Sequence, residues 1–429
     1  WKAVGPTVVQ RSIGAEVIVN ISASPFYTDK RTAREKMLAV RAADNEIFVA
    51  YVNMVGGQDE LVFDGGSIIH DPFGKEVTRG PQFEESLVIA DLDLEEVSRS
   101  RLHDARPKHE PSNKIEEIGT AAHIFVSERQ DNSRPVVEYS TPIRHAGLVE
   151  IYEALVLGTR DYVHKTGFSN VFIALSGGID SSLVAAIAVD ALGAENVIGV
   201  AMPSRFSSEG SLIDAKGLAE NLEIDLWELP IEAAFAAYLE TLDSRFKDTE
   251  IGVAEENLQS RIRGTLVMAL ANKFGGLVLT TGNKSEMAVG YATIYGDMAG
   301  GYAVIKDVPK TLVYELAQYR NTVGDLQAIP QSVIDKPPSA ELRPNQKDED
   351  SLPPYNVLDV ILKAYVEDDL GFQEIVDVGF DESIVRQIVT LVDRSEYKRR
   401  QAPPGIKITP RNFGRDRRMP IANRYRPFY

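Results

Sequence analysis

The segment Leu175–Ser182, LSGGIDSS, contains residue types that bind phosphate groups. Its two glycines follow an apolar run and allow backbone N–H groups to turn toward an anion. Ser181 and Ser182 add hydroxyl donors where a helix would direct the positive end of its dipole. Asp180 is too close to a bound phosphate to contact it without a cation, so it indicates Mg²⁺. The segment therefore predicts a phosphate cradle with a magnesium ion.

An ordinary strand-to-helix turn with serine caps is the alternative for this segment. The order of an apolar strand, SGGIDS and an Ala- and Val-rich helix favours the phosphate cradle. The GxxxxGK[ST] loop of kinases and GTPases is excluded because its lysine is absent. A loop that holds pyrophosphate as the leaving group indicates attack on the α-phosphate of ATP, which is adenylation.

The elements that position this loop begin at Ala146 and alternate between strands and helices. Apolar strand runs joined by helices indicate an α/β domain with a doubly wound parallel sheet that is covered on both faces. The expected strands are 171–175, 197–202, 224–229 and 277–281, and the expected helices include 148–163, 181–192, 210–221 and 381–394.

Residues 1–105 have a different pattern, with expected strands at 16–21, 47–52 and 87–92 and a helix at 30–43. Residues 106–142 are polar and punctuated by proline, which predicts a linker. The predicted organisation is therefore 1–105, a linker at 106–142, and a second domain at 143–429. Because the chain starts at Trp1 without an initiator Met, we expect a fragment that begins inside a domain.

Composition narrows the class of protein. The net charge of −17 argues against a general nucleic-acid binder, which needs a basic surface. The sequence lacks a membrane-spanning apolar run and a signal peptide, and a soluble cytoplasmic protein is the expectation. Cysteine is absent from the sequence, which excludes disulfides and thiolate sites within it.

The phosphate loop resembles that of the N-type ATP pyrophosphatases, a group that includes NAD, GMP, asparagine and argininosuccinate synthetases. Four further segments, in family order, resemble NAD synthetase: ENLQSRIRG (Glu256–Gly264), TTGNKSEMAVGYATIY (Thr280–Tyr295), KPPSAEL (Lys336–Leu342) and SEYKRRQAPPGIKIT (Ser395–Thr409). The resemblance covers Ala146 to the C-terminus and implies an adenine nucleotide α-hydrolase-like fold.

The resemblance also implies roles for the matching residues. Catalytic roles would fall to Asp180 and Lys310, and Mg²⁺ would be bound by Asp180 and Glu286. ATP would be bound by Leu175, Ser176, Gly177, Gly178, Ile179, Asp180, Ser181, Ser182, Thr281, Lys310 and Ser339, and deamido-NAD by Asn257, Arg261, Glu286, Lys398 and Arg399.

Each charged residue has a simpler alternative. Glu286 follows an apolar strand, where doubly wound sheets place ligands, but it is also placed to cap a helix. Lys310 follows Pro309 at a predicted helix start, which is unfavourable for a cation unless an anion is nearby; a solvated cation is the alternative. Lys398 and Arg399 are also typical of the C-terminal end of a helix, and the resemblance alone moves them to the substrate.

The N-terminal part resembles a nitrilase-type glutamine amidase domain through NISASPF (Asn20–Phe26) and YVNMVGGQDELVFDGGS (Tyr51–Ser67). This implies the C-terminal part of an αββα sandwich. The amidase Glu, Lys and Cys of that family would lie before Trp1. Ser24 and Lys30 match glutamine-contacting positions, although a turn hydroxyl and a surface cation are the alternatives.

Together these patterns predict ATP-dependent amidation of deamido-NAD to NAD, with AMP and pyrophosphate as products. The complete protein would take ammonia from glutamine, and the family implies a homo-oligomer. Another N-type synthetase, such as GMP synthetase, is one alternative, and the TTGNKSE and KRRQAPPGIK segments weigh against it. A nucleotide-binding regulatory protein is the other, and the presence of Glu286, Lys310 and Lys398 weighs against that.

Overall fold

The computed structural model describes residues 5–103, 119–128, 135, 137, 142–324, 327–343 and 346–425. The chain forms two compact units. The first contains Trp1–Gly56 and Phe63–Gly147, and the second contains Gly57–Val62 and Leu148–Tyr429. Within the described ranges, every helix is too short or too polar to cross a membrane.

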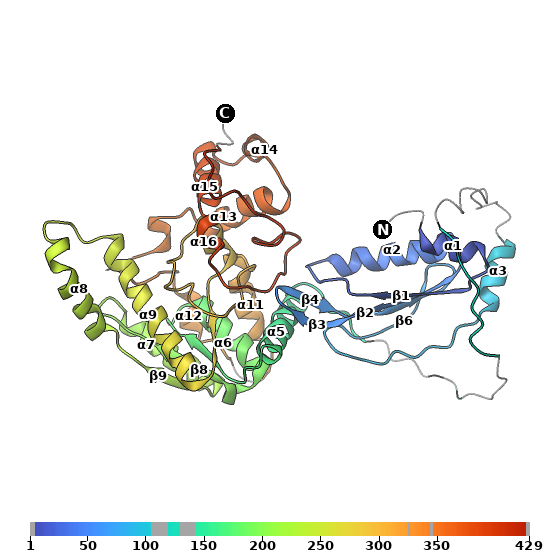
Figure 1. Ribbon diagram of the computed structural model, residues 1–429, viewed down its shortest axis with the longest axis horizontal. Helices are drawn as coiled ribbons and strands as arrows, with labels where there is room; N and C mark the ends of the chain where they lie inside the picture. Colours follow the sequence, from blue (N-terminus) through green and yellow to red (C-terminus); the bar gives the residue numbers. More distant parts are fainter. Residues whose placement is uncertain are drawn as a thin grey trace. The chain divides into compact units, whose positions relative to one another are not determined.

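The first unit is built on a four-stranded sheet in the order β1-β2-β5-β6. β1 and β2 are parallel, and β5 and β6 extend the sheet in antiparallel fashion. Helix α2 lies along the sheet (Figure 1), and its Leu38 and Ala42 are buried against Ile18 and Val49. The elements of this unit and the adjoining hairpin are α1 (Pro6–Ser12), β1 (Val17–Ser22), α2 (Lys30–Asn45), β2 (Phe48–Asn53), β3 (Val55–Gln58), β4 (Leu61–Asp64), β5 (Ile68–His70), β6 (Glu76–Arg79) and α3 (Glu95–His103).

The expected strands at 16–21 and 47–52 and the helix at 30–43 are confirmed as β1, β2 and α2. The strand expected at 87–92 is wrong. Leu87 and Ile89 are exposed, and this segment pairs with no strand among the described residues. An apolar run forms a strand only where a neighbouring strand accepts its backbone hydrogen bonds. Most of the predicted linker, 106–142, lies outside the described residues.

The second unit contains a five-stranded sheet in the order β11-β10-β7-β8-β9. All of its neighbouring strands are parallel. The chain runs from β7 outward through β8 and β9, and then returns to place β10 on the other side of β7. The strand order therefore reverses between β7 and β10, and doubly wound sheets bind ligands at such a point. The strands are β7 (Val171–Ala174), β8 (Val197–Ala201), β9 (Asp225–Glu228), β10 (Leu277–Thr280) and β11 (Tyr302–Ala303).

Helices cover both faces of this sheet, as the apolar strands require. α6 and α7 lie on one face of the sheet, and α5 and α11 pack against α6 there. α9 packs directly against β7 and β10. The expected strands and helices of this domain are all present within one to three residues of their expected bounds. The helices are α5 (Leu148–Lys165), α6 (Ile179–Leu192), α7 (Glu209–Leu222), α8 (Glu232–Phe246), α9 (Val253–Phe274), α10 (Lys284–Val289), α11 (Lys310–Arg320) and α12 (Gln331–Asp335).

The C-terminal helices form a lobe of the same unit with its own apolar core, drawn orange to red in Figure 1. Val385, Ile388 and Val392 of α15 are buried there, and they join Ala288 and Val289 of α10. Asp381 caps α15 by accepting hydrogen bonds from Ser383 N and Ile384 N. The helices of this lobe are α13 (Tyr355–Leu362), α14 (Phe372–Asp377), α15 (Glu382–Arg394) and α16 (Glu396–Arg399).

We expect Ile187→Ala to lower the free energy of unfolding of the second unit by about 2–5 kcal/mol. Ile187 of α6 is fully buried, and its truncation leaves a cavity in the apolar core around this helix. Ile213→Ala is the matched control, because Ile213 is 67% exposed on α7. Urea unfolding measures both, and equal losses from the two variants would contradict this packing.

Candidate active site

The phosphate loop joins the end of β7 to the start of α6 and depends on Gly177. This glycine has a φ of +73°, and a Cβ on it would lie 2.1 Å from the carbonyl oxygen of Ser211. Any side chain here would collide with the first turn of α7 and strain the backbone. Gly177 therefore brings the loop against α7 and leaves Ser176 and Gly178 facing the cavity beside it.

The hydroxyls of Ser181 and Ser182 brace the loop. They donate to the carbonyl oxygen of Gly178 at 3.0 and 2.9 Å, and both residues are buried. The Oγ of Ser181 also lies 3.2 Å from that of Ser176. In this arrangement both hydroxyls donate to a carbonyl oxygen inside the turn, and their direct contact with phosphate stays a prediction.

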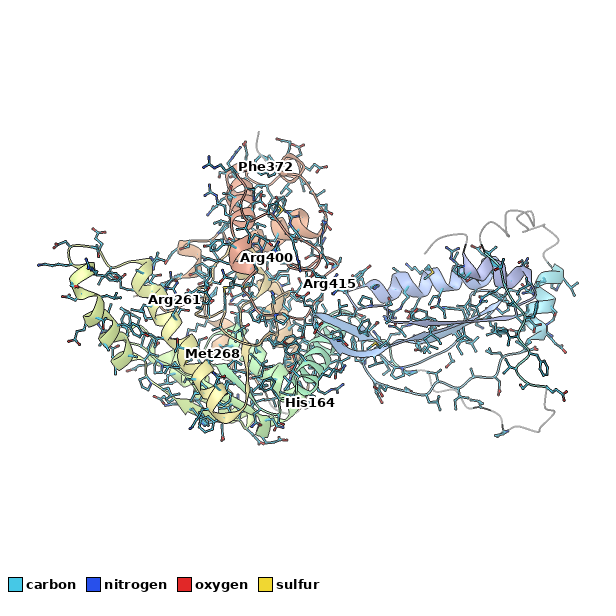
Figure 2. All side chains as sticks on the ribbon, viewed as in Figure 1. His164, Arg261, Met268, Phe372, Arg400 and Arg415 are labelled. Carbon is cyan, nitrogen blue, oxygen red and sulfur yellow. The ribbon has the colours of Figure 1, made fainter. Side chains whose placement is uncertain are left out.

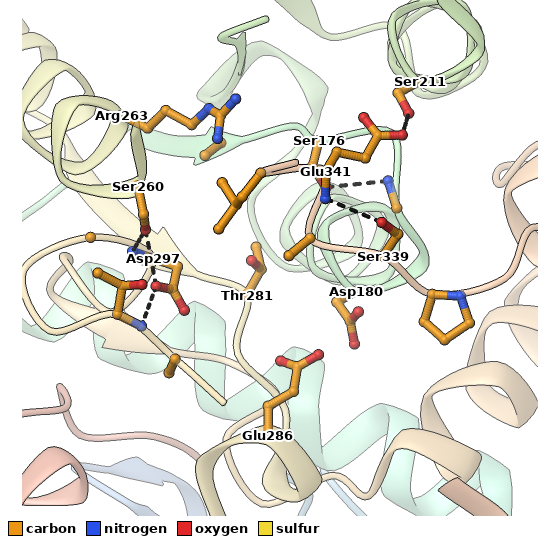
Figure 3. A pocket seen from close by; sticks show the side chains of 18 of the residues that line it. Ser176, Asp180, Ser211, Ser260, Arg263, Thr281, Glu286, Asp297, Ser339 and Glu341 are labelled. Carbon is orange, nitrogen blue, oxygen red and sulfur yellow. Dashed lines mark hydrogen bonds between the residues drawn. The ribbon is translucent and has the colours of Figure 1, made fainter. Parts of the chain in front are cut away.

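A cavity of about 560 Å³ lies at the carboxyl ends of β7 and β10, where the strand order reverses. Figure 3 shows Ser176 and Asp180 on one side of it, Thr281 and Glu286 on another, and Ser339 across from Thr281. The predicted residues that line it are Leu175, Ser176, Gly178, Ile179, Asp180, Asn257, Thr281, Glu286, Lys310, Ser339 and Lys398.

Two acids and one buried lysine form the charged floor of this cavity. The Nζ of Lys310 donates to Asp180 and lies 3.4 Å from an Oε of Glu286. Asn283 holds both acids in place: its Nδ2 donates to Asp180 at 2.9 Å, and its Oδ1 accepts from the backbone N of Glu286 at 3.0 Å. Glu286 is also part of the capping box of α10, as the simpler alternative predicted. The same side chain therefore caps the helix and lines the cavity.

Burial controls the protonation of this cluster. Burial, and then the charge of Asp180, raise the pKa of Glu286 to about 8. Burial disfavours the ammonium of Lys310, but Asp180 and Glu286 outweigh it and hold the pKa of Lys310 above its ordinary value. The lysine is therefore a permanent cation between two carboxyl groups that repel each other.

The oxygen atoms of Asp180 and Glu286 fit a magnesium ion. Mg²⁺ prefers oxygen ligands and is commonly held by one or two carboxylates together with substrate phosphates. The described residues contain no cluster of three or more His, Asp or Glu that could hold a metal on its own. A divalent cation would relieve the repulsion that raises the pKa of Glu286.

The segment Lys336–Arg343 forms one wall of the cavity and is tied to α7 through side chains. Glu341 accepts from Ser211 Oγ at 2.6 Å and Ser208 Oγ at 3.0 Å, although its own φ of +47° is unfavourable. Lys336 lies 3.4 Å from the same carboxylate. These contacts place Ser339 on the cavity.

Asn257 and Lys398 border the cavity from α9 and α16. The Oδ1 of Asn257 accepts from Thr293 Oγ1 at 2.7 Å. The Nζ of Lys398 donates to the carbonyl oxygens of Gly290 and Ala292 at 2.6 and 2.8 Å. Burial lowers the pKa of Lys398. Both residues thus bind the loop that follows α10 (Gly290–Thr293) and hold it at the edge of the cavity.

Two predicted substrate residues lie elsewhere. Arg261 is exposed on α9, where Figure 2 labels it, and its Nε donates to Ile294 O at 3.2 Å. Arg399 is buried, with donors bound to Ala288 O, Val392 O and Glu396. Neither arginine is among the described residues that line the cavity, and their contact with deamido-NAD stays a prediction.

Some lining residues escaped the sequence analysis, and Arg263 is the clearest. Its Nε donates to Met202 O at 3.0 Å, and burial lowers its pKa to about 10. Glu256, Ser260 and Arg263 lie on one face of α9, and Arg261 is rotated by about 100° from that face. Helical periodicity could thus have identified Arg263 as a residue that lines the cavity. Asp297, Glu341 and Asp348 carried no such local signal, because loops bring them to the cavity.

The predicted glutamine-contacting residues lie in the first unit. Ser24 exchanges two backbone hydrogen bonds with the side chain of Asn53, at 2.8 and 3.3 Å. The Nζ of Lys30 donates to Pro25 O at 2.5 Å and lies 5.1 Å from the centre of the Tyr27 ring. Ser24 therefore lies in the turn after β1 and Lys30 begins α2, and their role in glutamine binding stays a prediction.

Comparison with known proteins settles the family. The NAD synthase family matches residues 151–402, and the carbon-nitrogen hydrolase family matches residues 7–102. A glutamine-dependent NAD(+) synthetase of Thermotoga maritima is 49% identical over 427 residues, which are 99% of this chain and 73% of that relative. This chain belongs to the glutamine-dependent NAD(+) synthetase family. A family member from Aquifex aeolicus is 50% identical over 96% of this chain and 71% of its own length.

Solved structures of the family agree. The glutamine-dependent NAD+ synthetase of Acinetobacter baumannii, solved with ADP, is 40% identical, with a TM-score of 0.63 over 96% of this chain and 69% of its own. The NMN synthetase of Francisella tularensis is 27% identical, with a TM-score of 0.50 over 59% of this chain and 97% of its own. The predicted family and α/β fold class are thus confirmed.

Gly177→Ala should weaken ATP binding by at least tenfold, because the loop must move away from Ser211 to admit the methyl group. Gly217→Ala on α7 is the matched control: its added Cβ meets only Pro330, at 3.7 Å. Calorimetric titration with Mg-ATP compares them, and equal affinities for the two variants would refute the close approach.

Glu286→Gln should raise the melting temperature of the ligand-free protein at alkaline pH. With a pKa of about 8 against an ordinary value of 4.5, folded Glu286 holds a proton that the unfolded chain releases. Stability therefore falls as pH rises between those values, and glutamine removes that loss. Melting curves from pH 5 to 9, without metal, measure it. A difference between variant and parent that does not grow with pH would count against the shift.

Proposed function

We propose that this chain catalyses the ATP-dependent amidation of deamido-NAD to NAD, releasing AMP and pyrophosphate. The observation that carries the proposal is the phosphate loop, whose Asp180 contacts Lys310 beside Glu286 in a single cavity at the switch point of the sheet. Family membership supports the acceptor, and glutamine is the proposed source of nitrogen.

The reaction has two steps. First, an oxygen of the nicotinate carboxylate forms a bond to the α-phosphorus of ATP, and the bond to the β-phosphate oxygen breaks. Pyrophosphate then lies against the backbone N–H groups of the Ser176–Gly178 loop and the start of α6. Next, ammonia attacks the acyl carbon of the adenylate and loses a proton, and AMP leaves.

Lys310 stabilises the charge that develops during the first step. Its ammonium is already buried and oriented, so little reorganisation accompanies the transfer of negative charge to the leaving group. Asp180 and Glu286 would hold Mg²⁺, which supplies further positive charge to the phosphates. Asn257 and Lys398 border the part of the cavity that we assign to deamido-NAD.

The finer points stay proposals. We propose an amidase region at 1–105, a linker at 106–142 and a synthetase domain at 143–429, supported by the two family matches. The magnesium requirement, a homo-oligomeric state and a cytoplasmic location are further predictions of the family resemblance.

Incubation with deamido-NAD, Mg-ATP and ammonium tests the proposal, and we expect NAD, AMP and pyrophosphate in equal amounts. Ammonium is the appropriate donor because this sequence contains no cysteine. Formation of ADP, or turnover without deamido-NAD, would rule the reaction out. Nicotinate mononucleotide is a useful second acceptor, since a related structure is an NMN synthetase.

Lys310→Met should lower kcat by about a hundred- to a thousandfold, because a preorganised donor to the developing charge is lost. Lys216→Met is the matched control, since Lys216 is half exposed and pairs with Glu228 on the surface. Steady-state assays of NAD formation compare them. Retention of kcat by Lys310→Met would remove Lys310 from the reaction.

A further inference from the structure

The start of α11 combines two unfavourable features. Its first backbone N–H groups need acceptors, yet the preceding residue is Pro309, whose side chain cannot cap a helix. Its first helical residue is the cation Lys310, at the positive end of the helix dipole. The first turn, Lys310–Val313, contains no acid that could offset this charge. The helix start that carries the key ammonium therefore depends on groups from other elements.

Asp359 of α13 supplies the missing cap. One carboxylate oxygen accepts from the backbone N of Thr311 at 2.9 Å and from its Oγ1 at 2.8 Å. The side chain is 7% exposed, and burial raises its pKa, while the hydrogen bonds from Ser285 and Thr311 oppose that shift. Asp359 therefore caps the start of α11, although it belongs to another helix, α13.

The same carboxylate also holds α10. Its other oxygen accepts from Ser285 Oγ, and Ser285 Oγ in turn accepts from the backbone N of Lys310 at 2.8 Å. Ser285 directly precedes Glu286 on α10. One buried carboxylate thus connects the backbone beside Glu286 to the backbone of Lys310, and so fixes the spacing of these two helix starts.

The first residue of α13 touches the same lysine. The Nζ of Lys310 lies 5.4 Å from the centre of the Tyr355 ring, and Tyr355 Oη donates to Asp348 at 2.9 Å. A cation above an aromatic face is favourable when water is excluded. α13 therefore acts on Lys310 in two ways: Asp359 binds its neighbour Thr311 and the Ser285 hydroxyl that accepts from Lys310 N, and Tyr355 lies beside its ammonium group.

We propose that Asp359 is a positioning residue for the reaction: it holds the first turns of α10 and α11 so that Glu286 and Lys310 meet ATP in the correct geometry. The inference rests on the proposed function, because it gives Lys310 and Glu286 their roles there. Asp359 itself is absent from the described lining of the cavity, so it acts through these two residues.

A double-mutant cycle tests the inference, using Asp359→Asn, Lys310→Met and the double variant in the ammonium-dependent assay. Asparagine keeps the shape but turns an N–H₂ donor toward one of its hydroxyl or N–H partners. We expect Asp359→Asn to lower kcat by about ten- to a hundredfold, since a small misplacement of catalytic groups is that costly. We also expect a higher Mg²⁺ concentration for half-maximal rate. The combined loss of kcat in the double variant should be smaller than the product of the two single losses, because part of the effect of Asp359 passes through Lys310.

Two controls separate positioning from general stability. Asp393→Asn removes a carboxylate of the same lobe that accepts from Tyr365 Oη at 3.0 Å, and it should lower the melting temperature without changing kcat per folded molecule. Thr311→Ser keeps the hydroxyl that Asp359 binds and should retain kcat, whereas Thr311→Val should not.

Additive losses in the cycle would overturn the inference, and so would a loss for Asp359→Asn that only follows its folded fraction. Wild-type turnover is measured first and tests the proposed function separately. If the wild type forms no NAD, the dissociation constant of Mg-ATP is measured for the wild type and the three variants of the cycle instead of kcat. There, independent effects of Asp359→Asn and Lys310→Met would equally overturn the positioning role.

Discussion

The buried ammonium of Lys310 is the interaction on which this site depends. It lies at the positive end of a helix and away from water, a position that is unfavourable unless anions surround it. Asp180 from the phosphate loop provides the anion, and Glu286 from α10 provides a second carboxyl group 3.4 Å from the ammonium. The first turns of three helices, α6, α10 and α11, therefore meet at the ammonium group of Lys310. The electrostatic balance is incomplete, with two carboxyl groups for one cation, and it leaves room for a bound metal and phosphates.

The parallel sheet makes this convergence possible. α6 and α10 each follow a strand of the sheet, β7 and β10, which are neighbours although Ala174 and Leu277 are far apart in the sequence. Because the chain leaves β7 in one direction and returns on its other side, the loops after these strands separate and open a cleft. The apolar contacts of α6 with α5 and α11 then keep the helix starts in place.

Patterns in the sequence predicted the features that depend on residues close together in the chain. The strands and helices of the second unit, the phosphate loop, and the placement of Asp180, Thr281 and Glu286 on one cavity follow from short motifs and from the rule that ligands meet the carboxyl ends of parallel strands. Lys310 was anticipated by its odd position after Pro309. Its direct contacts with Asp180 and Glu286 were not, because these acids lie 130 and 24 positions away in the sequence.

The direction of a side chain depends on partners that a motif does not show. The hydroxyls of Ser181 and Ser182 donate to the Gly178 carbonyl oxygen, which lies within reach. Arg399 donates to the carbonyl oxygens of Ala288 and Val392 inside the lobe, and its contact with the substrate stays a prediction. The apolar run at 87–92 lacks a neighbouring strand among the described residues. The wall Lys336–Arg343 lies outside sheet and helix: the side chain of Glu341 ties it to α7, and the backbone N of Asp348 donates to Pro338 O at 3.2 Å. This segment can therefore be replaced as a unit to change which acceptor the cavity binds, because the sheet and the helices that stabilise the fold lie elsewhere.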